Sequence, residues 1–259
     1  SLFINVLPGL TVVGTVISNY NGTQISCNGA ADGEALVQET FVGPPPPPFP
    51  PPPPLIYLWS DGQTTAVATG LGVGTYIVTV TNGDGCTDTA SVTILSEPSP
   101  VIVSVDSSIN VDCNGDSTGA IFISASGGTG ILTYSWSNGA TTENISGLAS
   151  NVYTITVSDN NGCTATTTVT ITESGLLTVV IDSTINPSCN GTLDGNVFIT
   201  VSGGTLPYNY IWSNAMTTED LTGMASGNYS LTISDGNGCS DLISTTLLEP
   251  TAISIIMDS

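Results

Sequence analysis

The sequence contains no lysine, no arginine and no histidine among its 259 residues, but it contains 21 aspartates and glutamates. Soluble domains normally carry both signs of charge, on about a quarter of their residues. Without histidine the chain lacks the commonest general base and zinc ligand. Without lysine and arginine it lacks Schiff-base nucleophiles and phosphate clamps. We therefore predict that the protein is not an enzyme.

The missing cations also limit the partners of the chain. A formal net charge of −21 without any basic patch excludes binding to nucleic acid. No stretch approaches the roughly 18 consecutive apolar residues of a membrane helix, so we do not expect a membrane-embedded protein. Apolar residues nevertheless make up 40% of the sequence. That share is sufficient for a hydrophobic core, so the high charge does not indicate disorder.

An internal repeat organises the chain. Trp59, Trp136 and Trp212 are almost equally spaced, which defines a repeat of roughly 76 residues, and a cysteine follows each of them at one constant interval. An earlier cysteine precedes the tryptophan by the same interval in the second and third repeats and by a longer one in the first, where a proline-rich run is inserted. The predicted divisions are the end of a preceding repeat at 1–9, a first repeat at 10–98 with its insertion at 44–54, a second at 99–173, a third at 174–250 and the start of a following repeat at 251–259.

The repeats read as β-strands. Segments such as AIFISAS and YTITVSD in the second repeat alternate apolar with small polar residues, and turn-forming clusters separate them. No segment has a helical period. We predict an all-β protein of tandem immunoglobulin-like antiparallel β-sandwiches. The aromatic residues expected in the cores are Trp59, Trp136, Trp212, Tyr76, Tyr153 and Tyr229.

Six cysteines, two per repeat, form an even and regularly spaced set. Zinc binding is disfavoured because no repeat contains histidine or a Cys-x-x-Cys pair. We predict one disulfide within each repeat, namely Cys27–Cys86, Cys113–Cys163 and Cys189–Cys239. A bridge that closes about 50 residues stabilises a domain by roughly 4 kcal/mol on the chain-entropy model. Such bridges indicate an oxidising, extracellular location.

Four short motifs recur in the same order: Cys-Asn-Gly, Gly-Gly-Thr, Tyr-x-Trp-Ser and Asp-x-Asn-Gly-Cys. In this combination the chain resembles, over essentially its whole length, the SprB-type repeats of very large surface adhesins of gliding and related bacteria. The resemblance implies export by the type IX secretion system, a place at the cell surface, and a role in adhesion or gliding motility. The first repeat departs from the pattern, because prolines follow Gly43 where the other repeats have Gly127-Gly128 and Gly203-Gly204.

The proline-rich run is the first candidate site. Its eleven residues would span roughly 34 Å as a polyproline II helix at ~3.1 Å per residue. Such runs are often exposed spacers, but this one lies inside a repeat, and a preformed rod loses little entropy when it docks on aromatic side chains. We favour an assembly contact. The candidate residues are Pro44, Pro45, Pro46, Pro47, Pro48, Phe49, Pro50, Pro51, Pro52, Pro53 and Pro54.

The loops before the second cysteine of each repeat are the other candidate site. They contain Asp84, Asp159 and Asp235 among asparagines and glycines, and their hard oxygen atoms suit Ca²⁺. The EF-hand pattern is incomplete, and turn formation alone explains these residue types. Divalent ions would also relieve the repulsion among carboxylates that have no internal cation. We expect no required cofactor, with Ca²⁺ as the one candidate ion.

These features predict a structural role. We expect a stalk or fibre segment of a giant secreted cell-surface adhesin that mediates surface attachment, cell–cell attachment or motility. Arrays in which each unit contacts mainly its neighbours have roughly additive stability. We further expect the segment to form a homo-oligomeric filament of several chains. The alternative is a module that itself binds a glycan or another cell-surface ligand.

Overall fold

The computed structural model describes residues 9–42 and 54–254, and all regular structure in these ranges is β-strand. No helix long and apolar enough to cross a membrane occurs in this part of the chain. The first six strands are β1 (Gly9–Val16), β2 (Gly33–Val42), β3 (Ile56–Trp59), β4 (Val67–Leu71), β5 (Gly74–Thr81) and β6 (Thr87–Ile94). The next six are β7 (Ile102–Ile109), β8 (Gly119–Ser126), β9 (Thr133–Trp136), β10 (Ile145–Leu148), β11 (Asn151–Ser158) and β12 (Thr164–Ile171). The last six are β13 (Thr178–Ile185), β14 (Gly195–Ser202), β15 (Asn209–Trp212), β16 (Leu221–Met224), β17 (Gly227–Ser234) and β18 (Ser240–Leu247).

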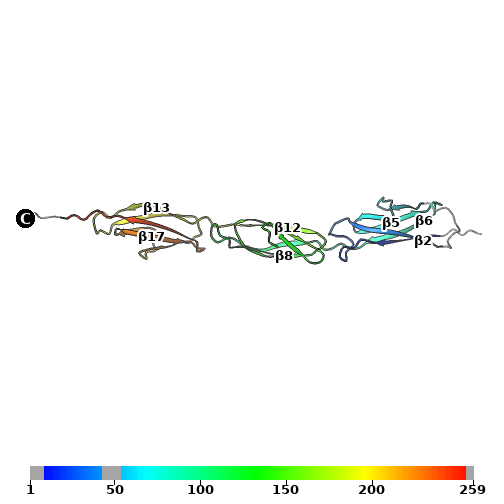
Figure 1. The fold of residues 1–259 in the computed structure, drawn as a ribbon, viewed down its shortest axis with the longest axis horizontal. Helices are drawn as coiled ribbons and strands as arrows, with labels where there is room; N and C mark the ends of the chain where they lie inside the picture. The colour runs from blue at the N-terminus through cyan, green and yellow to red at the C-terminus, as the bar shows by residue number, and fades with distance from the viewer. Residues whose placement is uncertain (1–8, 43–53, 255–259) are drawn as a thin grey trace, which may run out of the picture. The chain divides into compact units, whose positions relative to one another are not determined.

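Each set of six strands forms two three-stranded sheets. In the first set β1, β2 and β4 form one sheet and β3, β5 and β6 form the other, with antiparallel pairing. Figure 1 shows β5 beside β6 in this set. The same order recurs as β7–β8–β10 with β9–β11–β12, and as β13–β14–β16 with β15–β17–β18. The predicted fold class, all-β with immunoglobulin-like sandwiches, is confirmed.

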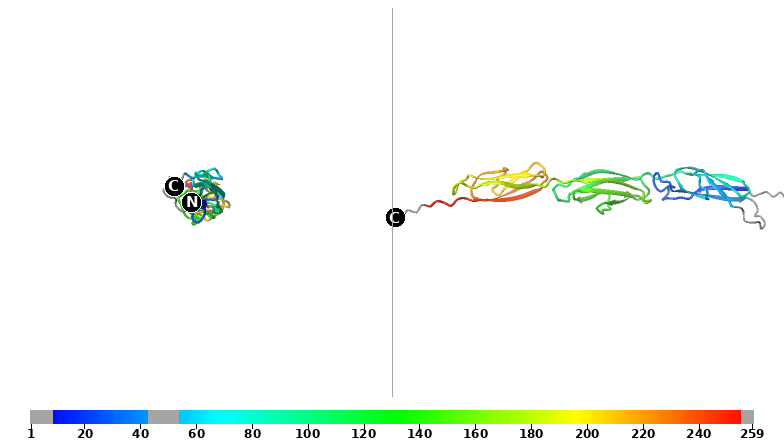
Figure 2. Two further views of the ribbon diagram at one scale, coloured as in Figure 1. Left: turned by 90° about the vertical axis from the view of Figure 1, so that its right-hand side faces the viewer. Right: turned by 90° about the horizontal axis from the view of Figure 1, so that it is seen from above.

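The described residues group into two compact units. The first unit holds β1–β6 with residues 124–142 and 154–167, and the second holds β13–β18 with residues 105–123 and 143–153. The three strand sets are separated by residues 95–101 and 172–177. Residues 98 and 173 lie in these two linkers; the division into three repeats at these positions stays a prediction. Figure 2 shows the strands of residues 178–247, drawn in yellow to red, running alongside one another within the second unit.

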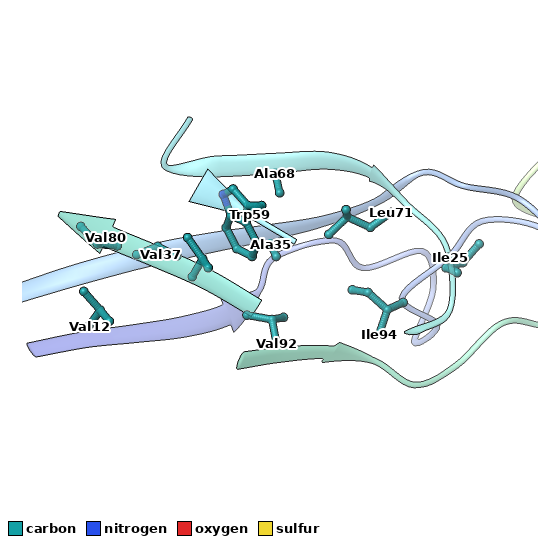
Figure 3. Close-up of a cluster of buried hydrophobic side chains, with 11 residues drawn as sticks. Val12, Ile25, Ala35, Val37, Trp59, Ala68, Leu71, Val80, Val92 and Ile94 are labelled. Atoms are coloured by element: carbon teal, nitrogen blue, oxygen red, sulfur yellow. The ribbon is translucent and has the colours of Figure 1, made fainter. Parts of the chain in front are cut away.

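The core of the first repeat is centred on Trp59, which is only 1% exposed. Figure 3 shows its indole, which comes from β3, beside Val37 from β2 and Ala68 from β4 of the facing sheet, with Val92 from β6 of its own sheet in the same cluster. The indole Nε1 donates a hydrogen bond to the backbone oxygen of Thr65 at 2.8 Å. The one polar atom of the buried indole therefore has a hydrogen-bond partner, as a tryptophan in a core requires.

The same aromatic arrangement recurs in the other repeats. Trp136 and Trp212 are 3% and 2% exposed, and each indole donates to the backbone oxygen six residues later, in both cases at 2.9 Å. The hydroxyls of Tyr76, Tyr153 and Tyr229 each donate to the carbonyl four residues earlier. These tyrosines tie the start of their own strand to the preceding turn, so the recurrence of the aromatic residues reflects packing.

Hydrogen bonds between the two sheets show which strand ends lie together. The backbone N–H of Val12 in β1 donates to the carboxylate of Asp88 in β6 at 3.0 Å, and Val179 in β13 donates to Asp241 in β18 at 2.9 Å. β1 and β6 therefore start at the same end of the sandwich, and so do β13 and β18. At the other end, the side-chain oxygen of Gln24 accepts the N–H of Leu95, just after β6, at 2.7 Å.

This topology shows that the predicted pairing of cysteines within each repeat is wrong. Cys86 precedes β6 at one end of the sandwich, whereas Cys27 follows β1 at the other end. The 8 residues of β6 separate these ends by about 26 Å at roughly 3.3 Å per residue, and a disulfide requires Cα atoms within about 7 Å. The observed disulfides are Cys27–Cys163 and Cys113–Cys239, while Cys86 and Cys189 are free thiols.

Candidate interface between repeats

Each disulfide joins two consecutive repeats. We call Cys27, Cys113 and Cys189 the early cysteines, and Cys86, Cys163 and Cys239 the late cysteines. The early cysteine of one repeat bonds the late cysteine of the next, with Cα–Cα distances of 5.6 and 5.5 Å. The four bonded cysteines are half-buried, and the two free ones are exposed. The cysteines that are bonded to a neighbouring repeat are therefore less exposed than the two that are not.

The early cysteine opens a Cys-Asn-Gly loop that its own repeat holds in place. In every repeat the glycine N–H donates to a glutamate carboxylate beyond the last strand, and the asparagine amide donates to the next carbonyl. The glycine–glutamate pairs are Gly29–Glu97, Gly115–Glu173 and Gly191–Glu249, at 2.9, 2.7 and 2.9 Å. The asparagine–carbonyl pairs are Asn28–Pro98, Asn114–Ser174 and Asn190–Pro250, at 3.2, 3.2 and 3.4 Å. The loop has the same bonds whether or not its cysteine has a partner.

The late cysteine closes a turn that one side-chain oxygen organises. This oxygen accepts the backbone N–H groups two and four residues further on, the second of which belongs to the cysteine. The accepting residues are Asn82, Asp159 and Asp235, with all six distances between 2.9 and 3.0 Å. This is the Asx-type turn that these residue types favour.

The second carboxylate oxygen of Asp159 and Asp235 holds the Gly-Gly-Thr loop. It accepts the N–H of Thr129 in the second repeat and of Thr205 in the third, both at 2.8 Å. In the first repeat the aspartate is replaced by Asn82, whose second polar atom is a donor. The sequence there also replaces the Gly-Gly-Thr loop by prolines, which have no N–H to donate. The first repeat therefore lacks both the second carboxylate oxygen that accepts this hydrogen bond and the Gly-Gly-Thr loop that donates it.

The first glycine of the Gly-Gly-Thr loop lies directly against the linker between repeats. Gly127 and Gly203 have φ angles of 81° and 74°. A Cβ atom at these positions would lie 1.9 Å from the oxygen of Pro100 and 1.8 Å from the oxygen of Leu176. Only glycine allows both this conformation and this approach. Each linker is therefore packed against the repeat that follows it.

An asparagine in the late-cysteine turn binds the preceding repeat beside each disulfide. The amide of Asn161 donates to the carbonyl of Ser26 at 3.0 Å, and the amide of Asn237 donates to the carbonyl of Asp112 at 2.9 Å. Both carbonyls immediately precede the early cysteine. At the first junction Asn21 also donates to the side-chain oxygen of Asn161. The junction thus combines a covalent bond with an amide–carbonyl hydrogen bond.

Backbone N–H groups stabilise the buried carboxylate of Asp235 at the second junction. Asp235 is only 7% exposed. Burial alone would raise its pKa, but the N–H groups of Thr205, Cys239 and Asn237 outweigh burial, so its pKa is lowered from the ordinary value of 3.8. Hydrogen bonds to the ionised form shift a carboxyl in this direction. The carboxylate therefore stays ionised and acts as an acceptor for the turn.

The remaining predicted sites are placed as follows. Asp159 and Asp235 accept backbone hydrogen bonds, whereas Asp84 is exposed. The described ranges contain no group of three or more His, Cys, Asp or Glu side chains that could hold a metal ion. Calcium binding stays a prediction. Pro44–Pro53 lie outside the described residues, and Pro54 is exposed, so the predicted assembly contact also stays a prediction.

Sequence reasoning missed the residues that hold the junctions. Glu97, Glu173 and Glu249 recur near the end of every repeat, and the last two follow their early cysteine at the same interval. That recurrence was the available signal. The asparagines Asn161 and Asn237 lie inside loops for which the sequence predicts turns or calcium binding. Their contacts across the junction depend on the three-dimensional pairing, which the spacing alone does not give.

Comparison with known families gives a match in two repeats. The family model described as the SprB repeat matches residues 106–141 and 181–217. Both stretches include an early cysteine and the tryptophan that follows it. No curated protein sequence matches the chain.

Several solved structures resemble the chain at low identity. Three N-terminal domains of the highly immunogenic outer capsid protein of bacteriophage RB49 are 16% identical, with 92% of this chain and 97% of that chain covered and a TM-score of 0.34. Immunoglobulin domains 1–4 of Sidekick-1 are 12% identical, with coverages of 92% and 72% and a TM-score of 0.33. A tetra-tandem repeat from the extending region of a large adhesion protein is 17% identical, with coverages of 92% and 74% and a TM-score of 0.24.

Proposed function

We propose that this chain, which the SprB repeat model matches at residues 106–141 and 181–217, is an adhesin-like repeat segment that acts as a structural stalk of a giant secreted cell-surface adhesin. The observation that carries this proposal is the disulfide between consecutive repeats, Cys27–Cys163 and Cys113–Cys239. A module that bound its ligand independently would not need a covalent bond to its neighbour. A segment that transmits force along an array would benefit from one at every junction.

Each disulfide bypasses a linker. The linkers at residues 95–101 and 172–177 are otherwise the only covalent connection between neighbouring strand sets. The disulfides close loops with sequence separations of 136 and 126, for which the chain-entropy model gives a stabilisation of about 5 kcal/mol each. A cut in a linker would therefore leave the two repeats connected.

Limited cleavage at a linker tests this continuity. A glutamate-specific protease can cut after the exposed Glu173 in the second linker. The proposal predicts that the two fragments stay together until a reductant is added. In a Cys113→Ser variant they should separate without reductant, whereas in a Cys189→Ser control they should not. Separation of the unreduced native fragments would contradict the proposal.

The stalk role and direct ligand binding predict different results for glycan binding and for filament formation. The resemblance to gliding-bacterium adhesins, the disulfides and the acidic surface support an extracellular role in attachment or motility, with export by the type IX system and assembly into a multi-chain filament as parts of the proposal. The fluorescently labelled segment should show no glycan binding on an array and should form ordered filaments in electron micrographs. Dose-dependent binding to one class of glycan would instead support a ligand-binding module.

A further inference from the structure

The two free cysteines are one early and one late cysteine. Cys189 occupies in the third repeat the place that Cys27 and Cys113 occupy in the first and second. Cys86 occupies in the first repeat the place of Cys163 and Cys239. Four of the six cysteines are bonded, and both bonds follow the same rule, early to late in the next repeat. The two free thiols are therefore the complementary halves of the same kind of junction.

The surface beside Cys189 corresponds to the early-cysteine side of the occupied junction at Cys113. Around Cys113, a hollow of about 350 Å³ is lined by Cys113–Asn114, by Gly175–Leu177 and by Gly238–Ser240 of the next repeat. Around Cys189, a hollow of about 420 Å³ is lined by Ser188–Asn190 and by Pro250–Ile253. The early-cysteine loop and the linker line both hollows at corresponding positions of their repeats. The counterpart of Gly238–Ser240 is the part that the Cys189 hollow lacks.

The early half-site is already formed without its partner. The bonds from Gly191 to Glu249 and from Asn190 to Pro250 match those in the two occupied junctions. The carbonyl of Ser188 corresponds to those of Ser26 and Asp112, which accept the amides of Asn161 and Asn237. A second repeat would meet a loop that needs no rearrangement, so little conformational entropy is lost on docking.

The turn of the late half-site at Cys86 is formed as well, although Asn82 replaces the aspartate of the other repeats and prolines replace their Gly-Gly-Thr loop. Its turn has the hydrogen bonds of the other two, from the N–H groups of Asp84 and Cys86 to Asn82. Asp84 stands where Asn161 and Asn237 donate across the junction. A carboxylate cannot donate to a carbonyl, so this half-site lacks one hydrogen bond and places a negative charge near the partner loop.

We infer that Cys189 and Cys86 are docking sites for further repeats of the same kind, and that a second copy of this chain can be joined head to tail through a Cys189–Cys86 disulfide. Cys189 receives the late-cysteine turn of the incoming repeat, and Cys86 receives a Cys-Asn-Gly loop. The inference rests on the geometry of the two occupied junctions and is independent of the stalk role.

Bond formation requires an oxidant, for which a small-molecule disulfide such as oxidised glutathione is sufficient. The thiolate of Cys189 attacks one glutathione sulfur, which breaks the glutathione disulfide and releases one reduced glutathione. The thiolate of Cys86 on the second copy then attacks Cys189 in this mixed disulfide and releases the second glutathione. Two thiols are oxidised, one disulfide is reduced, and the two thiol protons end on the two glutathione molecules.

Two single variants test the polarity of the junction. Cys86→Ser retains only the early half-site, and Cys189→Ser retains only the late one. In a glutathione redox buffer each variant alone should stay monomeric on a non-reducing gel, because it lacks a complementary thiol. An equimolar mixture should form a heterodimer whose linked peptides contain Cys189 and Cys86. Symmetric Cys86–Cys86 or Cys189–Cys189 dimers in comparable yield would overturn the inference.

Asp84 provides a second test of the same site. Asp84→Asn in the Cys189→Ser chain restores the amide that Asn161 and Asn237 provide. The heterodimer yield should rise about fivefold, the factor that one hydrogen bond typically contributes. The rate of reaction of Cys86 with a small aromatic disulfide serves as the control for altered thiol reactivity. If the mixture forms no heterodimer even with Asp84→Asn, or if the gain equals the gain in this control, the inference is wrong.

Discussion

The disulfides between repeats determine how far the chain can be extended by force. When the chain is pulled from its two ends, the shortest covalent path sets the maximum length. That path runs from Ser1 to Cys27, crosses to Cys163, returns along the chain to Cys113, crosses to Cys239 and continues to Ser259. At about 3.5 Å per residue, this path extends to about 340 Å, whereas the reduced chain extends to about 900 Å.

Single cysteine variants divide this difference. Cys163→Ser removes the first crossing, so the path must follow the chain from Cys27 directly to Cys113. The path then becomes longer by about 125 Å at about 3.5 Å per residue. Cys86→Ser changes a free thiol and should leave the length unaltered. The wild-type length alone is less informative, because disulfides within each repeat would give a similar path of about 350 Å.

Single-molecule force spectroscopy measures these lengths directly. The chain is held by handles at its ends, and the contour length at full unfolding is compared among wild type, Cys163→Ser, Cys86→Ser and reduced wild type. Disulfides within repeats would make the path of Cys86→Ser longer by about 205 Å. A gain of that size in Cys86→Ser would refute the pairing between repeats.

Three further predictions concern the repeats themselves. Hydrogen bonds from Ser188 and Thr192 lower the pKa of Asp194 from 3.8 to about 2. The contribution of this carboxylate to stability should therefore be present above pH 4 and lost as the pH falls to about 2. The melting temperature of Asp194→Asn should depend less on pH in that interval than the melting temperature of the wild type. Trp59→Ala should destabilise the first repeat by about 3–5 kcal/mol in urea unfolding, whereas Ile56→Ala on the same strand, with Ile56 64% exposed, should cost little, and equal effects would contradict the core assignment. Deletion of Pro45–Pro53 should leave the first repeat folded and reduce filament formation in light scattering, and unchanged assembly would refute the proposed contact.

The repeat and the strands could be predicted because they depend on local pattern. Trp59, Trp136 and Trp212 lie in the cores as their recurrence indicates, and the alternation of residues predicted β-strands between turn clusters. Disulfide pairing could not be predicted from spacing, because Cys27 and Cys86 are near in sequence order but lie at opposite ends of a sandwich. To predict this, one must know that β1 and β6 start at the same end of the sandwich, which the Val12–Asp88 hydrogen bond shows.

The acidic loops illustrate a second limit. From the sequence alone, turn formation and calcium binding both account for Asp159 and Asp235. A carboxylate that accepts three backbone N–H groups has the same sequence signature as a weak cation ligand. The distinction depends on where Thr129 and Thr205 lie, and each is 30 positions away from its aspartate in the sequence. Pairwise contacts at that range are set by the fold.

Disulfide mapping of the unreduced protein tests the central claim, that covalent bonds connect consecutive repeats. Trypsin has no site in the chain, but cleavage after Asp and Glu places the six cysteines in six separate peptides. The structure predicts that the peptide 160–173 is linked to the one ending at Asp32, and that 113–116 is linked to 236–241, while 85–88 and 183–194 join no other peptide of the same molecule. Linkage of 113–116 to 160–173, and of 183–194 to 236–241, would contradict it.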